Sequence, residues 1–125
     1  MESDKKMREK LIEDLEKIPR LMADKEELIY TLRQNQDELK LFLRTIELRI
    51  GQEVEAEEKD GKKVFSNATK RQIEAEARLS NDEEYQQKID YFNNQKITVD
   101  KHIMELSFLR DRFSAVRAIT RILGQ

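Results

Sequence analysis

The stretch Lys59–Arg71, KDGKKVFSNATKR, separates two long charged segments whose apolar residues recur at helical spacing. Asp60-Gly61 has the chemistry of a tight turn, because glycine adopts positive φ angles without steric cost. Residue 63 is also the midpoint of the 125-residue chain. We therefore expect a hairpin tip rather than a linker between domains. In such a hairpin residue i lies opposite roughly residue 126 − i, which pairs Met22 with Met104 and Ile18 with Phe108.

Before the tip, apolar residues from Leu11 to Ile50 follow alternating steps of four and three, the pattern of a coiled-coil seam. Polar Lys25 and Gln36 interrupt this seam. Pro19 lacks an amide donor and disfavours helix at the residue before it, so we expect a kink or a break there. Gly51 is a weaker candidate break. A second apolar set makes the apolar face wider than a two-stranded coil requires: Ile12, Leu21, Leu28, Leu41, Phe42 and Leu48.

After the tip, Ser66-Asn67 has the residue types that cap a helix N-terminus, and Ser80 to Glu83 reads as a capping box. These signals predict an all-α fold in one domain, residues 1–125, organised as a long antiparallel helical hairpin with a central loop and a short helix. The expected elements are helices at 1–18, 20–58, 68–79 and 81–123, with a tip loop at 59–67. The seam predicted to form the core or an oligomer interface comprises Leu15, Met22, Ile29, Leu32, Leu39, Leu43, Ile46, Ile89, Phe92, Val99, Ile103, Leu106, Phe113 and Val116.

Composition restricts the class of protein. The chain has no cysteine, so disulfides and thiolate metal sites are excluded. No apolar run approaches the roughly 20 residues of a membrane span, and the first residues lack the apolar core of a signal peptide. We expect a cytoplasmic protein with no membrane contact. Because a single pair of helices leaves wide apolar faces wet, we also expect a homo-oligomer, a dimer or larger, that forms a multi-helix bundle.

Signatures of catalysis are missing from the sequence. There is no nucleotide-binding glycine loop and no nucleophile elbow. His102 is the single histidine, which does not make a metal site by itself. Glu53, Glu57 and Asp60 could share one helix face, although nothing in the sequence supplies a pocket that would shift their pKa values. We expect a protein that is not an enzyme and that uses no cofactor or metal.

Two basic clusters are the candidate contacts with DNA or with a partner protein. The first lies at the tip and consists of Lys59, Lys62, Lys63, Lys70 and Arg71. The second lies near the C-terminus, where arginines share a helix with apolar residues and could pair with phosphate: Arg110, Arg117 and Arg121. Both clusters also have ordinary explanations, since exposed lysines favour solubility and cations are favoured near a helix C-terminus.

The central DGKKVFSNATKRQIEAEARLSNDEEYQ and the terminal ELSFLRDRFSAVRAITRIL resemble small coiled-coil proteins of unknown function encoded by bacterial phages and prophages. The likeness is carried by Ser66-Asn67, Arg71, Asp82 to Tyr85, and Leu106 to Arg117. Genes of that group often lie beside recombination genes. The resemblance implies an accessory role in DNA recombination or replication inside a bacterial host cell, through contacts with DNA or a DNA-processing protein.

Two alternatives stay open at this point. The chain could inhibit a host defence enzyme, a nuclease or a CRISPR effector, by blocking it or by imitating DNA phosphates. An acidic run would then be the contact: Glu53, Glu55, Glu57 and Glu58. The chain could instead be a scaffold whose tip grips a client protein through Val64 and Phe65.

Overall fold

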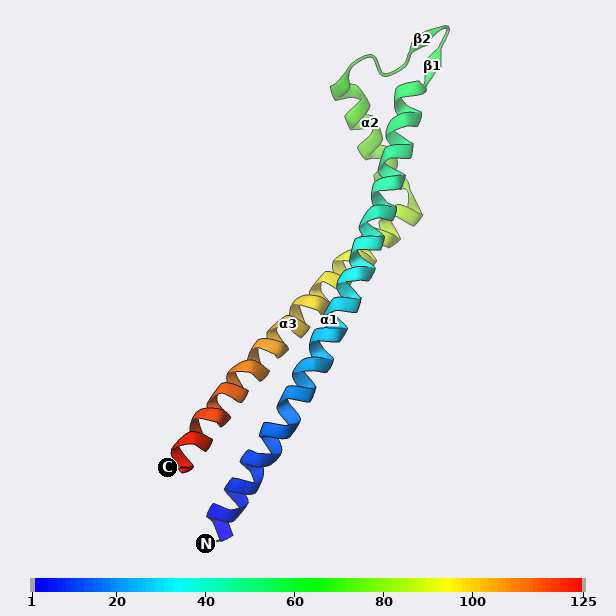
Figure 1. Ribbon diagram of the computed structural model, residues 1–125. Coiled ribbons are helices and arrows are strands. Elements are labelled where there is room, and N and C mark those ends of the chain that lie inside the picture. Colours follow the sequence, from blue (N-terminus) through cyan, green and yellow to red (C-terminus); the bar gives the residue numbers. More distant parts are fainter. Residues whose placement is uncertain (1, 125) are drawn as a thin grey trace. The chain divides into compact units, whose positions relative to one another are not determined.

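The computed structural model describes residues 2–124 and has three helices joined by a short hairpin (Figure 1). Helix α1 spans Glu2–Ala56, α2 spans Ala68–Asn81 and α3 spans Glu83–Leu123. Strands β1 (Glu58–Lys59) and β2 (Lys62–Lys63) form the antiparallel hairpin between α1 and α2. Because α3 returns along α1, the prediction of an all-α helical hairpin is confirmed.

The described residues form two compact units, each of which takes one part of α1 and one part of α3. Unit 1 combines α1 up to Arg33 with α3 from Ile97 onward, and unit 2 comprises Gln34–Lys96. Two long antiparallel helices touch only locally along their length, so each stretch of helix pairing buries its own apolar side chains.

The core of unit 2 lies under the end of α1 and the start of α3. Its buried members are Leu43, Ile46, Ile50, Val54 and Tyr85. Partly buried side chains from α1, α2, α3 and the loop complete the cluster: Leu39, Phe65, Ala75, Leu79, Ile89 and Phe92. α2 therefore covers the end of the helix pair, and it does so with residues such as Ala75 and Leu79 that lie one helical turn apart.

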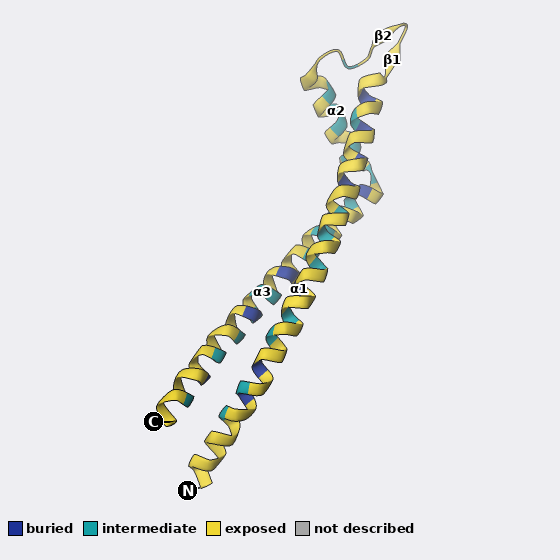
Figure 2. Ribbon diagram, viewed as in Figure 1, coloured by how far each residue is buried: buried dark blue, intermediate teal, exposed yellow. Residues whose placement is uncertain are grey.

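The core of unit 1 is smaller. Ile29, Val99 and Leu106 are buried together, with Met22, Leu32 and Ile103 packed against them. All fourteen residues of the predicted seam are buried or half-buried, and buried positions recur along α1 and α3 (Figure 2). The seam therefore supplies the cores within the chain, whereas all six residues of the second apolar set are exposed.

The expected pairing of residue i with roughly residue 126 − i holds in some places and fails in others. Arg112 pairs with Asp14, and Ile29 packs in a cluster with Val99 and Leu106. Met104 and Phe108, in contrast, expose 73% and 67% of their surface instead of meeting Met22 and Ile18. The midpoint of the sequence therefore gives the approximate register of the two long helices but not the individual contacts.

The prediction at Pro19 was a kink or a break, and the break is absent, because α1 continues through this residue and through Gly51. A proline inside a helix costs about 3 kcal/mol. The preceding Ile18 is only 2% exposed, and full burial of such a side chain contributes about 1.5–3 kcal/mol. Burial beside Pro19 therefore offsets much of the cost of the lost hydrogen bond.

One predicted cap is confirmed and one is wrong. The side chain of Asn67 accepts a 2.9 Å hydrogen bond from the Lys70 amide at the start of α2. Ser80 does not begin α3; its hydroxyl donates to the carbonyl of Glu76 within α2. Asp82 caps α3 instead, since its backbone is extended and its carboxylate accepts a 2.8 Å hydrogen bond from the Tyr85 amide.

Candidate binding surfaces

The hairpin tip is a two-residue turn closed by a short ladder. Asp60 and Gly61 both have positive φ angles, 56° and 77°, as the favoured hairpin turn with twist matching the strands requires. Glu58 pairs with Lys63, and Lys59 pairs with Lys62. The ladder continues through a 3.0 Å hydrogen bond from the Val64 amide to the Glu57 carbonyl. The tip therefore holds its lysines on a defined backbone.

Lys59, Lys62 and Lys63, which we call the tip lysines, are all exposed. Among the described residues none forms an ion pair with them. Lys59 and Lys62 also stand directly opposite each other across the ladder, and like charges in that position are destabilising. A bound anion would relieve this repulsion. Lys70 is exposed as well and lies in the first turn of α2.

The loop between the tip and α2 is anchored by Phe65 and Arg78. Phe65 packs on the core of unit 2, and the Arg78 guanidinium lies 5.8 Å from the centre of its ring. Arg78 donates hydrogen bonds to Glu57 and Glu74. The bond to Glu57, and then the bond to Glu74, raise the pKa of Arg78 above its ordinary value. Arg71, half-buried, donates a 3.4 Å hydrogen bond to the Phe65 carbonyl.

The C-terminal arginines belong to unit 1 and are largely engaged within it. Arg110 forms a 3.1 Å ion pair with Glu26. The Arg117 guanidinium lies 5.8 Å from the centre of the Phe113 ring on the same helix. Arg121 is exposed and lines a shallow groove of about 160 Å³ with Arg117. The structure therefore gives this cluster fewer free cations than its sequence indicates.

The acidic run is likewise partly neutralised. Glu53 forms an ion pair of 3.9 Å with Arg49 one turn earlier, and Glu57 pairs with Arg78. Glu55 and Glu58 are exposed and form no ion pair with a described residue. Two of the four carboxylates expected to imitate DNA phosphates, Glu53 and Glu57, therefore form ion pairs within the chain.

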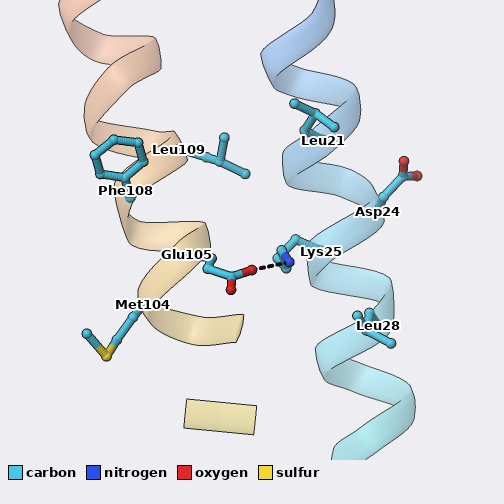
Figure 3. A pocket seen from close by; sticks show the side chains of 8 residues that line it. All are labelled: Leu21, Asp24, Lys25, Leu28, Met104, Glu105, Phe108 and Leu109. Atoms are coloured by element: carbon cyan, nitrogen blue, oxygen red, sulfur yellow. Dashed lines mark hydrogen bonds and ion pairs between the residues drawn. The ribbon is translucent and has the colours of Figure 1, made fainter. Parts of the chain in front are cut away.

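A polar cluster stands at the position where the seam is polar. Lys25 Nζ donates a 2.5 Å hydrogen bond to Oε2 of Glu105 (Figure 3). The same Nζ lies 3.1 Å from Nδ1 of His102. The hydrogen bond from Lys25 lowers the pKa of Glu105. Lys25 of α1 is therefore paired with Glu105 of α3, and His102 belongs to the same polar cluster.

Beside this cluster a groove of about 600 Å³ runs between α1 and α3 (Figure 3). Leu21 and Leu28 line it from α1, and Met104 and Phe108 line it from α3. Within residues 2–124 no group of three or more metal-ligating side chains is close enough to hold an ion. No helix among the same residues combines the length and apolarity that a membrane span needs.

Comparisons of the chain with known protein families, with curated proteins and with solved structures found no match.

Sequence reasoning left the role of Phe65 open, since its place at the tip suits packing on the hairpin, a short strand or contact with a partner. It missed the role of Arg78. Arg78 follows Glu74 by four residues, a spacing that favours an ion pair within a helix. Its second partner, Glu57, lies 21 residues away, and no local pattern reveals such a contact.

Proposed function

We propose that this protein is a non-enzymatic binding protein that contacts DNA through the tip lysines and acts as an accessory in phage DNA recombination or replication. The link to phage recombination comes from the sequence resemblance of residues 59–121. The contact with DNA is argued from the geometry of the tip.

The observation that carries the proposal is the exposure of the tip lysines. All three are exposed and form no ion pair with a described residue. Lys59 and Lys62 face each other across two short strands, and Lys63 lies opposite Glu58. Neutralising phosphates with lysines releases counterions, which is the main source of affinity in contacts that do not read sequence. The net charge of the chain is −2, so DNA contact is confined to this local patch and should weaken steeply as salt is added.

The tip also supports contact without base reading. A short ladder with a two-residue turn presents its lysines as point charges, and lysine binds phosphate without the bidentate geometry of arginine. We therefore expect little preference for sequence and binding to both single and double strands.

Inhibition of a host nuclease or CRISPR effector remains the alternative function. Its DNA-mimicry form would rest on Glu55 and Glu58 alone, since Glu53 and Glu57 are ion-paired. The client-binding alternative would rest on Val64, which is 42% exposed, because Phe65 packs on the core. Neither surface has an unpaired charge cluster comparable with that of the tip lysines.

Fluorescence anisotropy with labelled oligonucleotides at low salt tests the proposal. The test variant carries Lys59→Gln, Lys62→Gln and Lys63→Gln, and the matched control carries the same three changes on exposed lysines of α1, at Lys5, Lys6 and Lys17. Both variants have the same net charge. We expect the tip variant to lose at least tenfold in affinity and the control less than twofold.

Equal loss in both variants would mean that the chain responds to net charge and that the tip is not the contact. If the unaltered protein does not bind either oligonucleotide, direct DNA contact is wrong. An assay of nuclease inhibition with the same variants then tests the alternative, in which substitution of Glu55 and Glu58 should abolish inhibition.

A further inference from the structure

Helix α3 has a second apolar face in unit 1, beyond the one that packs on α1. Val99, Ile103 and Leu106 belong to the core cluster, whereas Met104 is 73% exposed and Phe108 is 67% exposed. Residues two apart on a helix point in directions about 200° apart, so Met104 and Leu106 face nearly opposite ways. Figure 3 shows the Met104 side chain directed away from α1.

This face has the spacing of a coiled-coil seam. Its positions follow alternating steps of four and three over the part of α3 that belongs to unit 1. Six of the eight positions are apolar, and the four large apolar side chains expose between 67% and 73% of their surface. We call these positions the outer seam: Ile97, Lys101, Met104, Phe108, Asp111, Ala115, Ala118 and Ile122.

We propose that the outer seam is the interface of a homodimer, in which α3 of a second copy packs antiparallel against α3 of the first. Residue i of one copy lies opposite residue 219 − i of the other, which is the register that maps the seam onto itself. Ile97 then faces Ile122, and Met104 faces Ala115. Ala115 and Ala118 leave room for the long side chains of Met104 and Lys101 opposite them, which favours interdigitated packing.

Charge selects the antiparallel orientation. In a parallel pair each seam residue would face its own copy, so Lys101 would meet Lys101 and Asp111 would meet Asp111. In the antiparallel register Lys101 faces Ala118 and Asp111 faces Phe108, so no like charges face each other. Residues at the two polar positions of a seam commonly set register and orientation in this way.

The residues that flank the outer seam agree with this orientation. Asp100 and Arg121 each directly precede a seam position, Lys101 and Ile122. Both are exposed, and neither forms an ion pair with a described residue. In the antiparallel register Asp100 of one copy and Arg121 of the other lie beside the same two seam layers, that of Ile97 with Ile122 and that of Lys101 with Ala118, and the two-fold axis repeats the contact.

The outer seam is long enough to pair with a second helix. It spans about 38 Å at 1.5 Å per residue, and each of its four large apolar side chains is at least 67% exposed. Met104 and Phe108 also line a groove with Leu21 and Leu28 of α1, each 41% exposed.

Sedimentation equilibrium of the full chain tests whether the outer seam is the dimer interface. The unaltered protein should have twice the chain mass at micromolar concentration. Met104→Glu combined with Phe108→Glu should weaken association at least tenfold and leave helicity unchanged, since both side chains are exposed. Leu41→Glu combined with Leu48→Glu is the matched control, because these leucines are exposed on α1 in unit 2. The control should keep association within twofold of the unaltered protein.

Disulfide cross-linking tests the register of the dimer. The chain has no cysteine of its own, so any disulfide must involve the introduced residues. Asp100→Cys and Arg121→Cys are made as two separate single variants. Under mild oxidation neither should cross-link alone, because the two copies of each cysteine lie more than about 25 Å apart along the antiparallel pair. An equimolar mixture of the two variants should give a cross-linked dimer.

Each outcome decides the proposal. A monomer at ~100 μM, where weak association would be seen, overturns it. A dimer that the change at Met104 and Phe108 leaves intact shows that another face associates. Cross-linking of each single variant with itself shows a parallel pair and overturns the register. The inference does not depend on the function proposed for the tip, because these variants leave the tip lysines unaltered.

Discussion

The hydroxyl of Tyr85 on α3 donates a 2.6 Å hydrogen bond to Oε1 of Glu47 on α1. Tyr85 is 7% exposed and belongs to the core of unit 2. Burial first, and then the hydrogen bond to the Glu47 carboxylate, raise the pKa of Tyr85 to about 12. One side chain therefore joins the apolar core to a polar contact between the two long helices, and it requires the neutral phenol.

This contact predicts a specific dependence of stability on alkaline pH. The pKa of Tyr85 is about 12 in the folded chain, against about 10 for an unfolded tyrosine. The stabilisation is therefore fully present below about pH 10 and is lost as pH rises through about 12. Urea unfolding at pH 7, 9 and 11 should show a steeper alkaline loss of unfolding free energy for the unaltered protein than for Tyr85→Phe. At pH 7 the substitution should cost about 1 kcal/mol, the net value of one hydrogen bond.

Tyr91→Phe is the matched control, since Tyr91 is on the same helix and is 53% exposed. Its alkaline curve should follow that of the unaltered protein. If Tyr85→Phe loses as much stability above pH 10 as the unaltered protein does, ionisation of Tyr85 is not the source of the loss.

A pair of leucines two residues apart on α1 tests the assignment of faces. Leu43 is 8% exposed and lies in the core of unit 2, whereas Leu41 is 67% exposed. Leu43→Ala should lower the unfolding free energy by about 3 kcal/mol through lost burial and a residual cavity. Leu41→Ala should change it by less than about 0.5 kcal/mol. Chemical denaturation followed by circular dichroism measures both, and equal effects would mean that the seam is assigned to the wrong face.

The same substitution at two glycines should have opposite effects. Gly51 lies inside α1, and a Cβ there would meet nothing within 4 Å. Gly51→Ala should therefore stabilise the protein by about 1 kcal/mol, the difference in helix propensity. Gly61 has a φ of +77°, so Gly61→Ala should destabilise the hairpin by about 1 kcal/mol.

Thermal unfolding of the two glycine variants shows directly whether each substitution stabilises or destabilises the protein. Gly51→Ala should raise the midpoint temperature. For Gly61→Ala the more local measure is hydrogen exchange of the Val64 amide, which closes the ladder onto the Glu57 carbonyl. Unchanged protection of that amide would contradict the strained turn.

Local signals in the sequence predicted the parts of the fold that local physics determines. The spacing of Leu39, Leu43 and Ile46 identified core residues, because a helix buries one face. Asp60-Gly61 identified the turn, because few residue pairs accept two positive φ angles. Asn67 identified the start of α2 for a similar reason, since its side chain satisfies an amide that the helix leaves unpaired.

Predictions failed where distant contacts compete with local preferences. Pro19 favours a kink or a break, but α1 continues through it, and the neighbouring Ile18 is buried. Ser80 has the pattern of a cap, but Asp82 takes that role because α2 continues to Asn81. Counting from the middle of the sequence gave the approximate register of the long helices, as Asp14 with Arg112 shows, but not which residues of α3 face α1, since Met104 and Phe108 are exposed. The ion pair of Arg78 with Glu57 was hidden because it joins residues far apart in the sequence.

The most direct test of the central claim is the salt dependence of DNA binding by the unaltered protein and by the triple variant Lys59→Gln, Lys62→Gln, Lys63→Gln. Affinity for a labelled single-stranded oligonucleotide is measured by anisotropy over a series of salt concentrations. Each phosphate neutralised on a single strand contributes about 0.7 to the slope of log affinity against log salt. If the three tip lysines are the contact, the triple variant should have a slope smaller by about 2. An unchanged slope would show that the tip lysines do not contact phosphate and would contradict the proposed function.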